Sequence, residues 1–258
     1  MSLLRDSFAG INGRFHLVGL GTVVNLLLLI GFSAANRAEE LAPLVFALLF
    51  VALGVSFAIQ GLTYHAAIDP PGRQPPSPVR LGLLLFPTLL WLQARLFLCY
   101  VGPYLLAIGG YAAVTHALPG EAWSKQADLW IRCLVQVVVP ILSTAATPLA
   151  IRLREHGQRG RPIRDGLRFF AAHRREAVLI LLVIGPAAVL GAAVELMLGP
   201  EAATDPVPRI PEAFAMFLGS YLELVALFAA SRVMALAFVA KAGDADRAAN
   251  PSAAGPAA

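Results

Sequence analysis

Residues 41–62 read LAPLVFALLFVALGVSFAIQGL and contain no charged side chain. The hydrocarbon core of a bilayer is about 30 Å thick, so a helix that spans it needs roughly 20 mostly apolar residues. Backbone N–H and C=O groups find no water there, and a helix satisfies them within its own segment. The stretch therefore predicts a transmembrane helix.

Five further stretches have the same character, near 16–34, 95–116, 129–151, 177–199 and 211–240. Of the 258 residues, 58% are hydrophobic and 14% are charged, whereas an average soluble domain is about 25% charged. These values exclude an ordinary soluble domain and a disordered chain. We expect an all-α polytopic membrane helix bundle with six transmembrane helices over residues 1–241. The small, polar segment 242–258 is expected to be a disordered cytoplasmic tail.

Positive charges are distributed unevenly between the predicted loops. The segment between the fourth and fifth spans is rich in arginine, and the N-terminal tail carries Arg5 and Arg14, whereas the alternate loops hold few cations and several carboxylates. Positively charged loops stay in the cytoplasm. We therefore expect a multi-pass protein of the bacterial inner (cytoplasmic) membrane with both termini cytoplasmic. The net charge of +4 does not require a nucleic-acid partner, because the arginine-rich segment would face anionic lipid headgroups. We therefore expect no nucleic-acid partner.

An internal repeat is the most informative pattern. Residues 78–86 read PVRLGLLLF and residues 162–170 read PIRDGLRFF, and Gly102-Pro103 corresponds to Gly185-Pro186 after a gap of one residue. Each copy follows one predicted span and precedes another. The sequence therefore predicts two parallel repeat units, about 41–116 and 129–199, a known way of building membrane proteins.

The repeated segment has the pattern of an amphipathic helix. Ile163, Leu167 and Phe170 are spaced i, i+4 and i+7, so they share one face of a helix. We expect two interfacial helices, with apolar sides toward acyl chains and arginines toward headgroups. The residues expected to contact the membrane surface or a partner are Arg164, Arg168, Arg174 and Arg175.

On PVRLGLLLF, PIRDGLRFF and the two Gly-Pro pairs, the chain resembles the repeated membrane domain of glycerophosphoryl diester phosphodiesterases and related uncharacterised six-span bacterial membrane proteins. The resemblance covers roughly 41–199 and concerns architecture. The sequence shows no soluble catalytic domain beside these segments, so the resemblance implies no phosphodiesterase activity here.

Ionisable residues within apolar spans are candidates for function because their charge is costly in hydrocarbon. Glu223 lies near the middle of the sixth predicted span, with Gly219 and Ser220 on the same face. It is expected to be a proton or cation site, a contact with a partner, or a structural carboxyl bonded to a neighbouring helix. The other candidates are Arg232, Arg95, Arg132 and Glu195, of which Arg132 and Glu195 are expected at similar depth and could pair.

Motifs for known chemistry are absent from the sequence. It contains no HExxH pair, P-loop, dinucleotide fingerprint or GxSxG, so we expect no metal, no cofactor and no catalytic residue of those types. Three functions remain. We expect first a non-enzymatic membrane subunit or assembly factor, with a possible protein partner subunit. The alternatives are a transporter or export-system permease subunit that uses Glu223, and an intramembrane enzyme acting on lipid.

Overall fold

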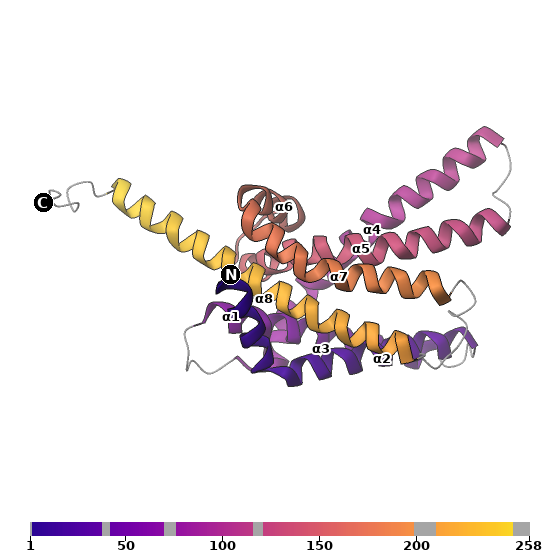
Figure 1. Cartoon of the computed structure of the whole chain (residues 1–258), viewed down its shortest axis with the longest axis horizontal. Helices are drawn as coiled ribbons and strands as arrows, with labels where there is room; N and C mark the ends of the chain where they lie inside the picture. Colours follow the sequence, from indigo (N-terminus) through magenta and orange to yellow (C-terminus); the bar gives the residue numbers. More distant parts are fainter. Residues whose placement is uncertain (1, 38–41, 70–75, 116–120, 199–209, 250–258) are drawn as a thin grey trace, which may run out of the picture.

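The computed structural model describes residues 2–37, 42–69, 76–115, 121–198 and 210–249. Within these ranges the chain is helical throughout its regular structure and forms no strand (Figure 1). The helices are α1 (Ser2–Asn12), α2 (Phe15–Arg37), α3 (Ala42–Ile68), α4 (Pro78–Thr115), α5 (Glu121–Glu155), α6 (Pro162–Ala172), α7 (Arg174–Leu198) and α8 (Ile210–Ala249). The all-α class expected from composition is confirmed.

Four apolar segments among the described residues are long enough to cross a membrane. They are Pro43–Ile68 in α3, Pro78–Leu98 in α4, Val137–Glu155 in α5 and Ala213–Phe238 in α8, and α2 adds the shorter apolar segment Phe15–Leu27. These helices indicate a multi-pass membrane protein. The predicted spans at 16–34 and 177–199 are not among the four, and Pro78–Leu98 overlaps the predicted span 95–116 only over 95–98, so the number six remains a prediction.

Helix α4 differs most from its sequence-based description. The predicted interfacial segment 78–86 and the predicted span 95–116 form one continuous helix of 38 residues. Its apolar stretch long enough to span begins at Pro78, well before the predicted start. Leu81, Leu85 and Leu89 are almost fully buried, since their helical spacing places them on one face against α3 and α5. At 1.5 Å per residue the helix is about 57 Å long, so only part of it fits in the hydrocarbon.

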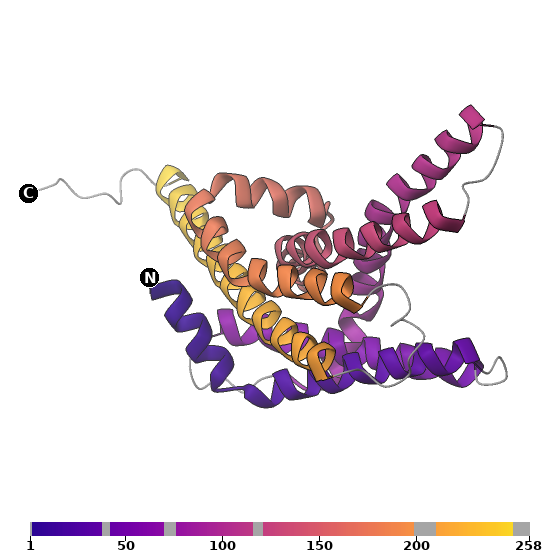
Figure 2. The same cartoon turned by 45° about the vertical axis from the view of Figure 1, so that its right-hand side comes forward.

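The two ends of the bundle are distinct. Figure 1 places α1, α6 and the C-terminal end of α8 at one end, and the ends of α2, α4 and α7 at the other. In both views the C-terminal half of α4 and the N-terminal half of α5 lean away from the rest of the bundle (Figures 1 and 2). Helix α8 continues to Ala249, past the predicted end of the membrane domain at 241. Residues 250–258 of the predicted tail lie outside the described part.

The centre of the bundle is made by α5 and α8. Residues 144–151 of α5 and 224–231 of α8 are buried at every position. Both segments are rich in small side chains, such as Ala145, Ala229 and Ala230, which are fully buried. Small residues let helix backbones approach closely, which is how helices associate in membranes. The sequence-based description of the N-terminus as a tail misses α1, which packs Ile11 into this core.

Helix α6 follows a well-defined helix end. Gly157 has φ +61°, and the N–H groups of Gly157 and Gln158 donate to the carbonyl oxygens of Arg154 (3.3 Å) and Leu153 (2.8 Å). This is the Schellman arrangement that ends a helix at a left-handed residue, which glycine adopts without steric cost. The chain then turns and starts α6 at Pro162, a residue suited to the first helical turn.

The apolar face of α6 packs on protein more than the sequence suggested. Gly166 and Phe170 are its buried residues, whereas Leu167 is 41% exposed. A Cβ at Gly166 would lie 2.8 Å from the carbonyl carbon of Ala145, so only glycine allows this approach to α5. The corresponding residue of the first copy, Gly82, would place a Cβ 3.0 Å from the carbonyl oxygen of Gly54 in α3. Both glycines thus lie against the backbone of the preceding long helix.

Candidate functional site

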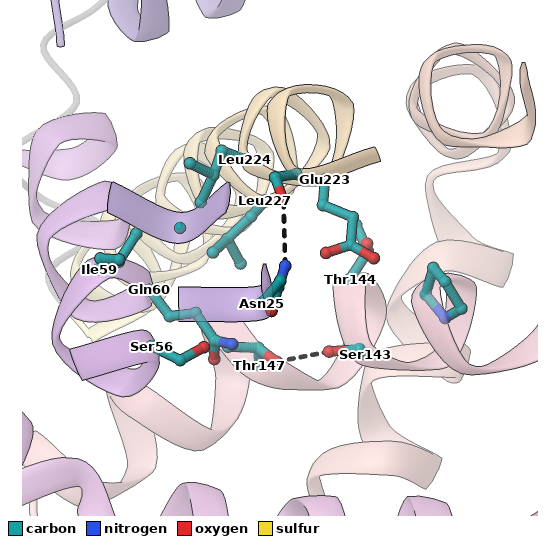
Figure 3. Close-up of a pocket in the computed structure, with 13 residues that line it drawn as sticks. Asn25, Ser56, Ile59, Gln60, Ser143, Thr144, Thr147, Glu223, Leu224 and Leu227 are labelled. Atoms are coloured by element: carbon teal, nitrogen blue, oxygen red, sulfur yellow. Dashed lines mark hydrogen bonds between the residues drawn. The ribbon is translucent and has the colours of Figure 1, made fainter. Parts of the chain in front are cut away.

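A polar cavity lies within the helix bundle, between α2, α3, α5 and α8 (Figure 3). Its volume is about 80 Å³. A water molecule needs roughly 10–15 Å³ open to its centre, so the cavity has room for several waters or one small solute. The polar residues that line it are Asn25, Ser56, Gln60, Ser143, Thr144, Thr147, Ser220 and Glu223.

Helix α8 contributes the ionisable group. Ser220, Glu223 and Leu227 are spaced i, i+3 and i+7, which puts them on one face of the helix. Glu223 is exposed at this cavity, although the next residues along the helix are buried. Figure 3 shows its side chain extending from α8 with the carboxylate beside Thr144. Among the described residues no cation forms an ion pair with it, so its charge is uncompensated by protein there.

Helix α5 contributes hydroxyl groups. Ser143, Thr144 and Thr147 line the cavity, and the hydroxyls of Ser143 and Thr147 lie 3.3 Å apart, in hydrogen-bonding distance. Pro140 lines the same wall one turn earlier. The hydroxyls of Ser143, Thr144 and Thr147 make the α5 wall rich in oxygen acceptors.

The remaining polar groups come from α2 and α3. The amide nitrogen Nδ2 of Asn25 donates to the hydroxyl of Ser220 over 3.1 Å and ties α2 to α8. The side chain of Gln60 extends between Ser56 and Thr147 (Figure 3). Its Oε1 is buried and has no hydrogen-bond partner among the described residues. A buried acceptor without a donor costs about 1–3 kcal/mol, and this one borders a cavity that a ligand can fill.

The cavity's chemistry follows from its charge. Among the described residues of the lining, Glu223 is the single ionisable one, and the lining also presents hydroxyl and amide oxygens from three other helices. The lining contains no His or Cys, and the described residues contain no cluster of three metal-binding side chains. One carboxylate among neutral oxygens matches a monovalent cation, whereas Ca²⁺ takes six to eight oxygen ligands, commonly with several carboxylates.

The structure does not gather the five sequence candidates at this cavity. Arg232 points its guanidinium toward α1, where it pairs with Asp6 at 3.4 Å. Arg95 lies over the ring of Trp91, 4.9 Å from the centroid. The side chains of Arg132 and Glu195 lie outside the described residues, so their pairing remains a prediction. Of Arg232, Arg95 and Glu223, the candidates whose side chains the structure describes, Glu223 lines the cavity.

Sequence reasoning overlooked Asn25, Ser56 and Gln60. Each is a single polar residue within an apolar run, VVNLLLL, GVSFA and FAIQG respectively. That interruption was the available signal, since a polar side chain within a membrane helix needs a partner or a polar cavity.

The predicted surface arginines lie on α6 and at the start of α7, and all are exposed: Arg164, Arg168, Arg174 and Arg175. Arg164 Nε donates to Asp165 Oδ1 over 3.1 Å, and the backbone N–H of Arg161 donates to Asp165 Oδ2 over 3.0 Å. The bond from Arg161 N–H, reinforced by Arg164, lowers the pKa of Asp165 below its ordinary value. Asp165 therefore stays ionised and holds the first turn of α6.

A second polar cluster joins α3 to α5. The imidazole of His65 is held between two carboxylates, with Nε2 2.7 Å from Glu155 Oε1 and Nδ1 3.2 Å from Asp69 Oδ2. All three side chains are less than one-fifth exposed. His65 and Glu155 lie 90 residues apart in sequence, so spacing gave no sign of their contact. It ties the ends of two long helices together.

No protein-family model matches this chain, no curated protein matches it, and no solved structure matches it.

Proposed function

We propose that this protein binds a monovalent metal cation at the Glu223 cavity and uses that site in transport across the membrane. The observation that supports the proposal is the position of Glu223, an uncompensated carboxylate facing an oxygen-lined cavity between apolar helices. A charge at the depth of the hydrocarbon is costly unless it is paired. A cation of charge +1 would neutralise Glu223 and give Gln60 Oε1 a positively charged partner.

The composition of the lining favours a metal cation over a proton alone. A proton needs only the carboxylate, whereas the cavity adds the hydroxyls of Ser143, Thr144 and Thr147 and the amide oxygen of Gln60. These groups come from two helices besides α8, which carries Glu223. A cation bound among these groups would favour one packing of α3 and α5 against α8 over another. A shift between two such arrangements of the helices couples a bound ion to movement across a membrane.

The topology is part of the proposal. We infer a six-span protein built from two parallel units, with both termini in the cytoplasm and the arginine-rich α6 on the same side. The equivalent contacts of Gly82 and Gly166 support the duplication, since each lies against the backbone of the long helix that precedes it. The location of α1, α6 and the end of α8 at one end of the bundle supports the shared side (Figure 1).

The test is cation uptake into proteoliposomes that contain the full chain, measured separately for Na⁺, K⁺ and protons with internal fluorescent indicators. We expect uptake of Na⁺ or K⁺ by the wild type and loss of at least about tenfold in rate in Glu223→Gln. Glu176→Gln is the matched control, because it makes the same change at a residue in the first turn of α7, outside the cavity lining. Uptake by Glu223→Gln at the rate of this control would refute the proposal.

A membrane subunit that docks a partner protein is the second candidate. Its support is the exposure of Arg168, Arg174 and Arg175, which present positive charge at the α6 end of the bundle. Purification of the tagged chain from its native membrane, followed by mass spectrometry, tests this function. A stoichiometric partner that is lost when these arginines are changed to glutamine supports it, and recovery of the chain alone contradicts it.

A further inference from the structure

A positively charged hollow lies beside α6, apart from the Glu223 cavity. It is lined by Arg95 of α4, by Gly160 and Arg161 of the connection from α5, and by Ile163, Arg164 and Leu167 of α6. Its volume is about 700 Å³ and it is open to the surface. Residues far apart in the sequence thus bring three guanidinium groups to one place.

The positive charge of this hollow is only partly neutralised by the protein. The carboxylate of Asp165 accepts a hydrogen bond from the guanidinium of Arg164, but its contact with Arg161 is to the backbone N–H. The Arg95 guanidinium rests on the indole of Trp91, and no carboxylate pairs with the guanidinium of Arg95 or Arg161 among the described residues. Guanidinium groups bind phosphate oxygens in pairs of parallel hydrogen bonds, so the hollow suits a phosphate.

The surface around the hollow is apolar and exposed. On α4, Trp91 is 58% and Leu98 61% exposed, and on α6 Leu167 forms part of the wall while remaining 41% exposed. In a protein with membrane-crossing helices, such surfaces contact acyl chains. Exposed arginines, by contrast, belong at headgroup depth, and tryptophan prefers the same level. The hollow therefore lies where a phosphate and two acyl chains of one molecule can both be accommodated.

We infer that the hollow formed by Arg95, Arg161 and Arg164 binds the phosphodiester headgroup of an anionic glycerophospholipid. The phosphate lies among the three guanidinium groups, and the acyl chains follow the exposed face of α4 past Leu98. A free phosphate would bind the guanidinium groups but leave most of the open hollow and its apolar border unoccupied. This inference is independent of the cation proposed at Glu223.

The test is native mass spectrometry of the full, delipidated chain in detergent, titrated with phosphatidylglycerol, phosphatidylcholine or inorganic phosphate. An arginine near an anionic membrane surface contributes a factor of about five in affinity. The double variant Arg95→Gln/Arg161→Gln is therefore expected to bind phosphatidylglycerol about 30-fold more weakly. Arg5→Gln, at an exposed arginine of α1 outside the hollow, is the control and is expected to bind like the wild type.

Three outcomes would contradict this inference. Wild-type protein that binds phosphatidylcholine as strongly as phosphatidylglycerol overturns it, and so does competition by inorganic phosphate at equal concentration, which would indicate a site for free phosphate. The variant Arg95→Lys/Arg161→Lys keeps the charge but not the paired hydrogen bonds, so its preference for phosphatidylglycerol should lie between those of the wild type and the glutamine variant. If this folded variant loses the preference as fully as the glutamine variant, attraction of an anionic headgroup is not the cause.

Discussion

Substitution of Gly166 by alanine tests the packing of α6 on α5. Alanine is a better helix former than glycine by about 1 kcal/mol, so at an open helical position the change should stabilise the protein. At Gly166 the added Cβ would overlap the carbonyl group of Ala145, a backbone atom that cannot turn aside. Overpacking of this kind costs about 1–3 kcal/mol. We therefore expect the free energy of unfolding to fall by up to about 2 kcal/mol, because the gain in helix propensity offsets only part of the cost.

The matched control is Gly185→Ala in α7, because a Cβ there meets no atom within 4 Å. This variant should be as stable as the wild type or more stable by up to about 1 kcal/mol. Both variants can be compared by unfolding in mixed micelles with increasing sodium dodecyl sulfate, followed by tryptophan fluorescence. If Gly166→Ala proves at least as stable as Gly185→Ala, α6 does not approach α5 in the way described.

Two other polar contacts make separate predictions. His65→Ala removes the imidazole between Asp69 and Glu155 and should lower the free energy of unfolding by about 1–3 kcal/mol. The control His156→Ala, at an exposed position, should change it little. Equal effects of the two variants in the same unfolding assay would contradict the role given to His65. Asp165 has a lowered pKa in the folded state, so its contribution to stability is present above its ordinary pKa of about 3.9 and is lost as the pH falls through the folded value. Asp165→Asn should therefore be less stable than the wild type near pH 7 and approach it as the pH falls through the folded pKa of Asp165, as measured by thermal unfolding; a gap that persists at still lower pH would contradict this linkage.

Composition and hydropathy were sufficient for the general architecture. Long apolar runs with few charges favour helices, because a helix satisfies its own backbone hydrogen bonds. The sequence therefore predicted the helical class and the long apolar helices α3, α5 and α8. The pattern PIRDGLRFF also predicted α6 well, because Pro162 marks its start. The same pattern was less informative at 78–86, where the following apolar residues continue the helix into α4 without a break.

The site could be predicted only in part. Glu223 stands out in sequence because it is a carboxyl in an apolar helix, and the structure places it at the cavity. Asn25 and Gln60 gave a weaker signal, since one polar amide within a helix does not reveal which neighbour it meets. The ion pair of Arg232 with Asp6 could not be predicted, because Asp6 lies in an N-terminal segment that was expected to be a tail. Contacts between distant segments depend on packing that local patterns do not encode.

The most direct test of the cation site is chemical labelling of Glu223 in the intact protein. A lipophilic carbodiimide attacks protonated carboxyl groups in apolar surroundings, and mass spectrometry of the digested chain identifies the labelled residue. Labelling is compared in Li⁺, Na⁺, K⁺ and N-methylglucamine at constant pH and ionic strength, with the Glu176 peptide as the internal reference.

The account predicts that Glu223 is labelled in N-methylglucamine and that at least one of the three metal cations protects it several-fold, while labelling of Glu176 is unchanged. Labelling of Glu223 that is the same in all four cations would contradict a metal cation bound at this carboxylate.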